Sequence, residues 1–217
     1  MANTPTLLAR LREATRASHA QLDAAVRITT AADYVRFLQA SLAALEILEP
    51  VVAQAVPALV SVERVPAARA DLAELHSTVL PPQPLAWAPT TASAGLGAAY
   101  VLEGSTLGGL VIAARVEALG ITATRYLRLR GKHTSRRWHA FLEALDVSAL
   151  HTTDAERGLV CDAACAAFQH YTDAYRAAGM VPLPMTSSRW IRVPRSRSIS
   201  RARSSRTACC LPAVPPS

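Results

Sequence analysis

The stretch from Gly97 to Ala114 most constrains what this chain can fold into. Its sequence is GAAYVLEGSTLGGLVIAA, in which both ends are apolar and helix-forming while the middle holds Gly104, Gly108 and Gly109. Each glycine costs a helix interior about 1 kcal/mol relative to alanine. Because glycine has no Cβ, a flat or bulky group can lie directly against the backbone, and the helix can bend there. The stretch therefore predicts a bent helix that closes over a planar ligand.

The same glycines have a second interpretation as a contact between two helices. Gly104 and Gly108 have the spacing of a close helix–helix packing motif, which occurs in globular cores and in membranes. Glu103 lies in the middle of the segment, and an isolated carboxylate at the depth of a bilayer is costly. The sequence therefore predicts no membrane partner.

The composition favours helices over sheets. The chain has 217 residues, enough for one domain with a substantial core, and 51% of them are hydrophobic while 18% are charged. Much of the apolar share is alanine and leucine, and aromatic residues make up only 5%. No stretch shows the two-residue alternation of a strand between hairpin turns. We expect an all-α fold with a single domain over residues 1–181.

Capping signals place several helices. Thr30-Ala-Ala-Asp33 and Thr153-Asp-Ala-Glu156 have the capping-box pattern that opens a helix. Gly120 is a glycine of the kind that commonly follows the last residue of a helix, so it predicts a helix C-terminus there. We expect the helix after Thr30 to bend or end at Pro50, and helical structure to continue past Pro57.

The net charge of +7 comes from the end of the sequence. Seven arginines between Arg189 and Arg206 account for the whole excess of 23 Lys+Arg over 16 Asp+Glu. Residues 182–217 are rich in arginine, serine and proline, so we expect them to be disordered. Their abrupt change in character also fits a reading frame shifted from the original coding sequence. Nucleic acid is the partner that the sequence favours least, because its binding would depend on this tail alone.

The cysteines and the N-terminal residues bear on the cellular compartment. Cys161, Cys165, Cys209 and Cys210 lack flanking histidines and zinc-type spacing, so we expect reduced thiols. The first residues show no basic and apolar leader with a cleavage site, which predicts a cytoplasmic protein.

His19 is the candidate metal ligand. It falls on the apolar stripe of the first predicted helix, together with Leu11 and Leu22. A histidine on such a stripe is more often a buried core residue than a ligand. Arg12 and Arg16, seven and three residues earlier, lie on the same side of that helix. An imidazole that faces a cavity with cations at its rim suits a metal macrocycle that carries carboxylates.

Three segments resemble the heme oxygenase family. Leu11-Arg-Glu-Ala-Thr-Arg-Ala-Ser-His19 resembles the helix that carries the proximal iron ligand. Tyr100-Val-Leu-Glu-Gly-Ser-Thr-Leu-Gly-Gly109 resembles the distal helix, in particular that of the bacterial branch found beside bacteriophytochromes. Arg130-Gly131 through Trp138-His-Ala-Phe141 resembles a later segment of the same branch. The first two motifs, together and in this order, are more specific than either alone.

The resemblance implies a heme oxygenase fold, with heme held between the first helix and a kinked, glycine-rich distal helix. It implies that His19 ligates the iron and that Arg12, Arg16 and Tyr100 bind heme. It also implies a catalytic role for the distal residues Gly104, Ser105, Gly108 and Gly109. Heme, which is cofactor and substrate, would be cleaved with O₂ to biliverdin, CO and ferrous iron. The implied partners are a ferredoxin- or flavin-type reductase and a bacteriophytochrome.

Ser105 departs from the animal-type enzymes, which have an aspartate at this place. A serine hydroxyl can hold a water but carries no charge. Glu103 is adjacent, but one step along a helix rotates it by about 100°, away from the predicted heme face. Arg128, Arg130 and Lys132 are further candidates for the heme carboxylates, unless they belong to a solvated basic loop.

Two alternatives to an enzyme that cleaves heme remain. The first is a heme-binding or heme-buffering protein that keeps His19 and the cavity but lacks turnover. The second is a helical enzyme that uses no heme, as in thiamin salvage or with a quinone cofactor. Failure to bind hemin would favour the second, and a hemin complex that survives reductant and air would favour the first.

Overall fold

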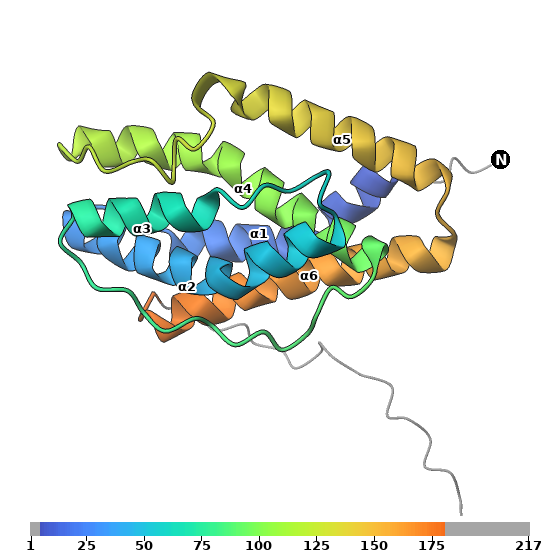
Figure 1. Ribbon diagram of the computed structural model, residues 1–217, viewed down its shortest axis with the longest axis horizontal. Helices are drawn as coiled ribbons and strands as arrows, with labels where there is room; N and C mark the ends of the chain where they lie inside the picture. The colour runs from blue at the N-terminus through green and yellow to red at the C-terminus, as the bar shows by residue number, and fades with distance from the viewer. Residues whose placement is uncertain (1–4, 181–217) are drawn as a thin grey trace, which may run out of the picture. The chain divides into compact units, whose positions relative to one another are not determined.

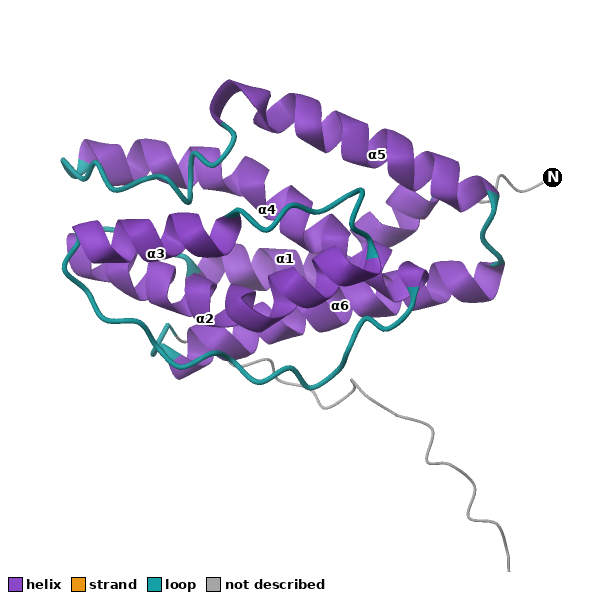
Figure 2. Cartoon of the chain, viewed as in Figure 1, coloured by secondary structure: helices purple, strands orange, loops and turns teal. Residues whose placement is uncertain are grey.

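The computed structural model describes residues 5–180. This part of the chain contains helices and no strand (Figures 1 and 2). The helices are α1 (Leu7–Ala25), α2 (Ala31–Ala55), α3 (Arg64–Glu74), α4 (Ala92–Ala118), the 3₁₀ turn η1 (Gly131–His133), α5 (Thr134–Leu150) and α6 (Asp154–Ala177). The prediction of an all-α fold is confirmed. The tail expected over residues 182–217, with Cys209 and Cys210, lies outside the described residues.

Local signals set several helix ends where the sequence predicts them. The Thr30 hydroxyl accepts a hydrogen bond from the Asp33 amide, and the Asp33 carboxylate accepts one from the Thr30 amide. Thr153 and Glu156 make the same reciprocal pair at the start of α6. Gly120 follows the end of α4 with a φ of 79°, the left-handed conformation that stops helices. Both predicted capping boxes and this C-terminus are confirmed.

Helix α2 does not end at Pro50, and the helical structure after this proline stops earlier than predicted. It runs through Pro50 and stops at Ala55, so the expectation that helical structure continues past Pro57 is wrong. Val56 has φ −138° and ψ 64°, outside the helical region. The cause is steric, because a proline ring disfavours the α conformation in the residue before it.

Helix α4 occupies the middle of the fold. It packs against α2, α5 and α6, while α1 packs against α5 and α6. In Figure 1 the two halves of α4 run in different directions, as expected for a helix that is rich in glycine near its middle. By length and composition α4 alone among the described helices could cross a membrane, but half of its most apolar window is buried inside the protein.

Gly97 brings the backbones of α4 and α6 together. A Cβ at Gly97 would lie 2.0 Å from the carbonyl oxygen of Val160 and 3.0 Å from the amide nitrogen of Ala164. No side chain fits there, so a glycine is required for this helix pair to pack.

We expect Gly97→Ala to lower the free energy of unfolding by about 1–3 kcal/mol or more, because the added methyl group forces the two helices apart. Gly158→Ala is the matched control on α6, since a Cβ there meets nothing within 4 Å. The control should raise stability by up to about 1 kcal/mol, the helix propensity difference. Urea unfolding measures both, and equal stabilities of the two variants would contradict the packing role of Gly97.

A buried network of ion pairs connects α2, α3 and α4. The Arg64 guanidinium, 1% exposed, donates from Nη1 to Glu49 Oε1 at 3.1 Å and from Nη2 to Glu103 Oε1 at 2.9 Å. Arg130, from the segment before η1, donates from Nη1 to Glu103 Oε2 at 2.7 Å. The side chain of Arg130 is only 10% exposed, so the alternative that it belongs to a solvated basic loop is wrong. These ion pairs connect α4 to α2, to α3 and to the segment before η1.

Candidate cofactor-binding cavity

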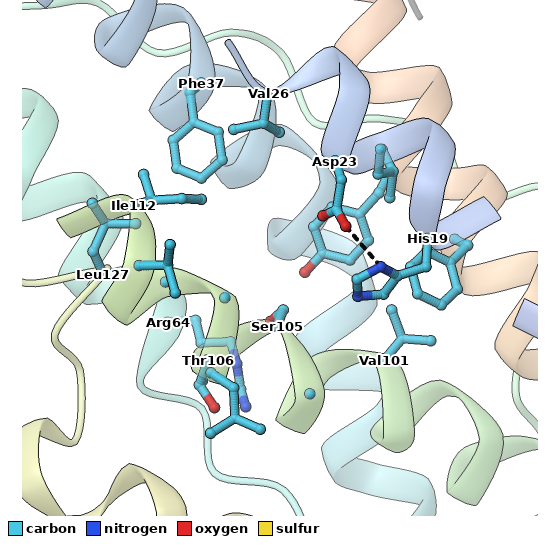
Figure 3. A pocket seen from close by; sticks show the side chains of 18 of the residues that line it. His19, Asp23, Val26, Phe37, Arg64, Val101, Ser105, Thr106, Ile112 and Leu127 are labelled. Carbon is cyan, nitrogen blue, oxygen red and sulfur yellow. Dashed lines mark ion pairs between the residues drawn. The ribbon is translucent and has the colours of Figure 1, made fainter. Parts of the chain in front are cut away.

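A cavity of about 480 Å³ lies between α1 and α4. Its volume falls within the range of about 300–1,000 Å³ that is typical of small-molecule and cofactor sites. Figure 3 shows His19 and Asp23 on α1 facing Val101 and Ser105 on α4 across this space. Further lining comes from α2, α6 and the segment after α4, chiefly through Phe37, Phe168, Tyr126 and Leu127. The walls are mostly apolar, as in sites that bind flat organic cofactors.

His19 presents an oriented imidazole to the cavity. Its Nδ1 lies 3.0 Å from Asp23 Oδ2, one helical turn later (Figure 3). Its ring meets Phe168 edge-on, with the ring centroids 5.8 Å apart. A carboxylate on one ring nitrogen is the usual arrangement for a metal-ligating histidine, because it fixes the tautomer and leaves Nε2 to coordinate. The side chains of His19 and Asp23 are 64% and 70% exposed, which places the pair at the mouth.

Asp23 is a site residue that the sequence reasoning missed. A carboxylate four residues after a histidine on a helix is a readable signal, since such residues are neighbours on the helix surface. The pairing could therefore have been predicted once His19 was singled out.

His19 is the only histidine that borders the cavity within residues 5–180. His170 is buried, with Nε2 2.9 Å from the carbonyl oxygen of Ala44, and burial lowers its pKa. The described residues contain no group of three or more His, Cys, Asp or Glu side chains that could hold a metal ion. A single imidazole suits a metal whose other ligands belong to a macrocycle.

Three of the glycines of α4, namely Gly104, Gly108 and Gly109, border the cavity but have different neighbours. A Cβ at Gly108 would meet nothing within 4 Å. A Cβ at Gly104 would touch the Trp138 ring at 3.6 Å, an ordinary van der Waals contact. A Cβ at Gly109 would lie 2.9 Å from the carbonyl oxygen of Leu127. Gly108 therefore leaves open space beside the helix, whereas Gly109 is needed for the segment after α4 to pack.

Ser105 has its proton directed away from the cavity. Its Oγ donates to the carbonyl oxygen of Leu102 at 2.8 Å. The Leu102 carbonyl oxygen also accepts a hydrogen bond from Arg64 Nη2 at 3.1 Å. The lone pairs of the Ser105 oxygen are left as acceptors. Glu103 does not border the cavity, because its carboxylate is held in the buried ion-pair network. The prediction that Glu103 turns away from the ligand face is confirmed.

The predicted basic residues lie outside the cavity lining. Arg12 and Arg16 are exposed on α1, and Arg16 Nη2 pairs with Glu13 at 2.9 Å. Tyr100 does line the cavity. Burial raises the pKa of Tyr100, whereas a hydrogen bond with Thr15 and the charge of Arg12 lower it in part. Contact of Arg12 and Arg16 with the carboxylates of a ligand stays a prediction.

The two remaining basic candidates, Arg128 and Lys132, also lie away from the cavity. Arg128 pairs with Glu117 at the surface, with Nη2 2.6 Å from Oε2. Lys132 is exposed and does not border the cavity. The structure thus brings together His19, Tyr100, Gly104, Ser105, Gly108 and Gly109, and it leaves the basic candidates apart from them.

These features define an all-α protein with one histidine facing a glycine-bearing helix across an apolar cavity. Comparison with models of protein families and with curated proteins gives no match to the sequence. The structure is similar to the crystal structure of the NO- and CO-bound heme oxygenase from Neisseria meningitidis, with a TM-score of 0.66. The two sequences are 22% identical, and the match covers 85% of this chain and 99% of that one. The chain has the heme oxygenase fold.

Proposed function

We propose that this chain is a heme oxygenase, which cleaves heme with O₂ and electrons from an external ferredoxin- or flavin-type reductase to biliverdin, CO and ferrous iron. The observation that carries the proposal is the imidazole of His19, which is held by Asp23 and lines the same cavity as the open backbone at Gly108. The fold shared with a solved heme oxygenase supports it. From the sequence resemblance we infer that the enzyme works in the cytoplasm. Its role there is to supply a bilin chromophore to a bacteriophytochrome or to release iron.

The residues of the cavity fit heme. One neutral imidazole with a carboxylate behind it is the proximal ligand expected for an iron that must react with O₂. The apolar side chains of Leu22, Val26 and Ile112 suit the face and edge of a porphyrin. Arg12 and Arg16 are exposed on α1, near the mouth where His19 lies, and have long side chains that can reach carboxylates.

Heme, when bound, supplies the oxygen chemistry and is itself the molecule that is cleaved. The chain's own residues bind and orient it. Asp23 holds the His19 ring so that Nε2 is presented to the cavity. The backbone at Gly108 admits a flat ring close to α4, and the apolar walls exclude water from most of its surface. Ser105 adds to the wall on α4 a hydroxyl oxygen that can accept a hydrogen bond, because its proton is donated to Leu102.

Ser105 also supports a second candidate, a heme-binding protein without turnover. A hydroxyl whose proton is already used by Leu102 provides no charge and no free donor to the distal side. Such a protein would bind heme through His19 and store it intact.

A hemin titration followed by reduction in air separates these functions. A heme oxygenase forms a one-to-one complex with a Soret band, which bleaches to biliverdin when reductant and O₂ are added. A carrier forms the same complex but keeps its Soret band under these conditions. A chain that binds no hemin would contradict both proposals and favour a helical enzyme without heme.

Gly108→Leu should separate heme binding from folding. The added side chain occupies open space beside α4, so we expect hemin affinity to fall about 5- to 150-fold, because overpacking costs about 1–3 kcal/mol. Leucine is the better helix former, so the apo-protein should be no less stable. Hemin titration and thermal unfolding measure the two effects, and a variant that binds hemin as the wild type does would show that the ring does not lie against Gly108.

A further inference from the structure

The segment between α4 and η1 supplies part of the cavity wall. Tyr126 and Leu127 line the cavity, and Figure 3 shows Leu127 on its wall together with Ile112. The carbonyl oxygen of Leu127 lies so close to α4 that a Cβ at Gly109 would be 2.9 Å from it. Residues 119–130 belong to no helix, so their buried backbone groups need partners on other elements. The position of this wall therefore depends on those partners.

Asp71 on α3 holds the segment by its backbone. The Asp71 side chain is 0% exposed; its Oδ1 accepts a hydrogen bond from the amide of Arg125 at 3.0 Å, and its Oδ2 accepts one from the amide of Tyr126 at 2.8 Å. Oδ1 also accepts from Arg125 Nη1 at 3.2 Å. Hydrogen bonds to a charged acceptor are the strong ones, and here both oxygens bind successive amides. Asp71 thus fixes the backbone at the point where the chain enters the cavity wall.

Two further side chains hold the same segment. Tyr34 on α2, also 0% exposed, donates from its hydroxyl to the carbonyl oxygen of Ala123 at 2.7 Å. Glu74 on α3 accepts from the Thr122 hydroxyl at 3.1 Å and pairs with the Arg125 side chain, but the Glu74 side chain is 37% exposed. The segment is therefore held by two buried side chains, one on α2 and one on α3, and by one side chain at the surface.

We propose that Asp71 and Tyr34 are positioning residues that set the orientation of a bound heme in its own plane, through the wall made by Tyr126 and Leu127. A flat ring held by one axial ligand can rotate about the bond to that ligand, so the groups that line its cavity decide its orientation. This wall belongs to the same cavity as His19. The orientation of the ring decides which of its edges is cleaved, a consequence that rests on the proposed heme oxygenase function.

Asp71→Asn tests the attachment of the segment in the apo-protein. Asparagine has a similar size, but its NH₂ group replaces one acceptor oxygen with a donor that faces a backbone N–H. Hydrogen exchange of the Arg125 and Tyr126 amides should therefore become about tenfold faster or more. Glu74→Gln is the matched control on the same helix and segment, and it should leave these two amides as protected as in the wild type. Equal protection in the two variants would overturn the role of Asp71.

The orientation of the ring is measured in the hemin complex without turnover. Proton NMR of the cyanide-bound ferric form resolves the methyl groups of the ring, whose shifts depend on how the ring is seated relative to its axial ligand. Asp71→Asn should change these shifts, and Tyr34→Phe, which removes a single hydroxyl, should change them too. Glu74→Gln should give the wild-type shifts. Wild-type shifts in Tyr34→Phe and in Asp71→Asn would overturn the proposal, and Tyr34→Phe alone decides if Asp71→Asn does not fold.

Reduction of the hemin complexes in air then tests the consequence for cleavage. Asp71→Asn should change the ratio of the biliverdin isomers about fivefold or more, which corresponds to about 1 kcal/mol, whereas Glu74→Gln should keep the wild-type ratio. A loss of stability alone would lower the yield and leave the ratio unchanged. If the wild type binds hemin without breaking it down, the proposed function fails, and the methyl shifts still decide on the positioning role. A wild type that binds no hemin would overturn both.

Discussion

His19→Ala is expected to lower hemin affinity at least about 100-fold and to abolish breakdown of the heme. Loss of a side chain that only orients a metal ligand typically costs about 10–100-fold in metal affinity, so loss of the ligand itself costs at least as much. His19 is the only imidazole that borders the cavity among the described residues. Absorption titration with hemin measures the affinity, and the position of the Soret band reports the change in ligation.

Two controls keep this result specific. His139→Ala removes an exposed histidine on α5 that does not border the cavity, and it should bind hemin like the wild type. Added imidazole should restore a wild-type Soret band to His19→Ala, because the deletion leaves room for a free ligand. The His19 side chain is mostly exposed, so the variant should unfold at the wild-type temperature. A wild-type spectrum and affinity for His19→Ala would contradict its assignment as ligand.

Glu103→Ala is expected to have the largest effect on stability, a loss of about 3–5 kcal/mol of unfolding free energy, because it leaves buried positive charge without its partner. The Glu103 carboxylate binds Arg64 and Arg130, and all three side chains are 10% exposed or less. Without Glu103, Glu49 is the one carboxylate of this network that still pairs with Arg64. Urea unfolding measures the difference.

Glu117→Ala is the matched control for the buried pair. Glu117 is also on α4 and pairs with an arginine, Arg128, but both side chains are more than a third exposed. A surface pair of this kind contributes at most about 1 kcal/mol. Equal losses for Glu103→Ala and Glu117→Ala would show that burial does not strengthen the Glu103 network.

The fold was predictable because its signals are local. Capping boxes at Thr30 and Thr153, the apolar stripe that contains His19, and the absence of strand-like alternation each depend on residues within a few positions of one another. The end of α2 at Ala55 also has a local cause, because Pro57 disfavours the helical backbone conformation of Val56.

The site was predictable only in part, because its remaining features depend on contacts between distant segments. Arg64 meets Glu49 and Glu103 across 15 and 39 positions of sequence, so no pattern in the sequence joins them. The basic character of the segment with Arg130 suggests a solvated loop until its partner on α4 is known. The path of an irregular segment also decides that Gly109 packs against Leu127 while Gly108 stays open. Sequence spacing alone treats these two glycines alike.

A crystal structure of the hemin complex is the most direct test of the site described here. We predict that the iron is bound by Nε2 of His19, with Asp23 still on Nδ1, and that the porphyrin fills the cavity against the backbone of α4 at Gly108. Coordination of the iron by any other residue, or hemin bound outside the space between α1 and α4, would contradict the assignment of this cavity as the heme site.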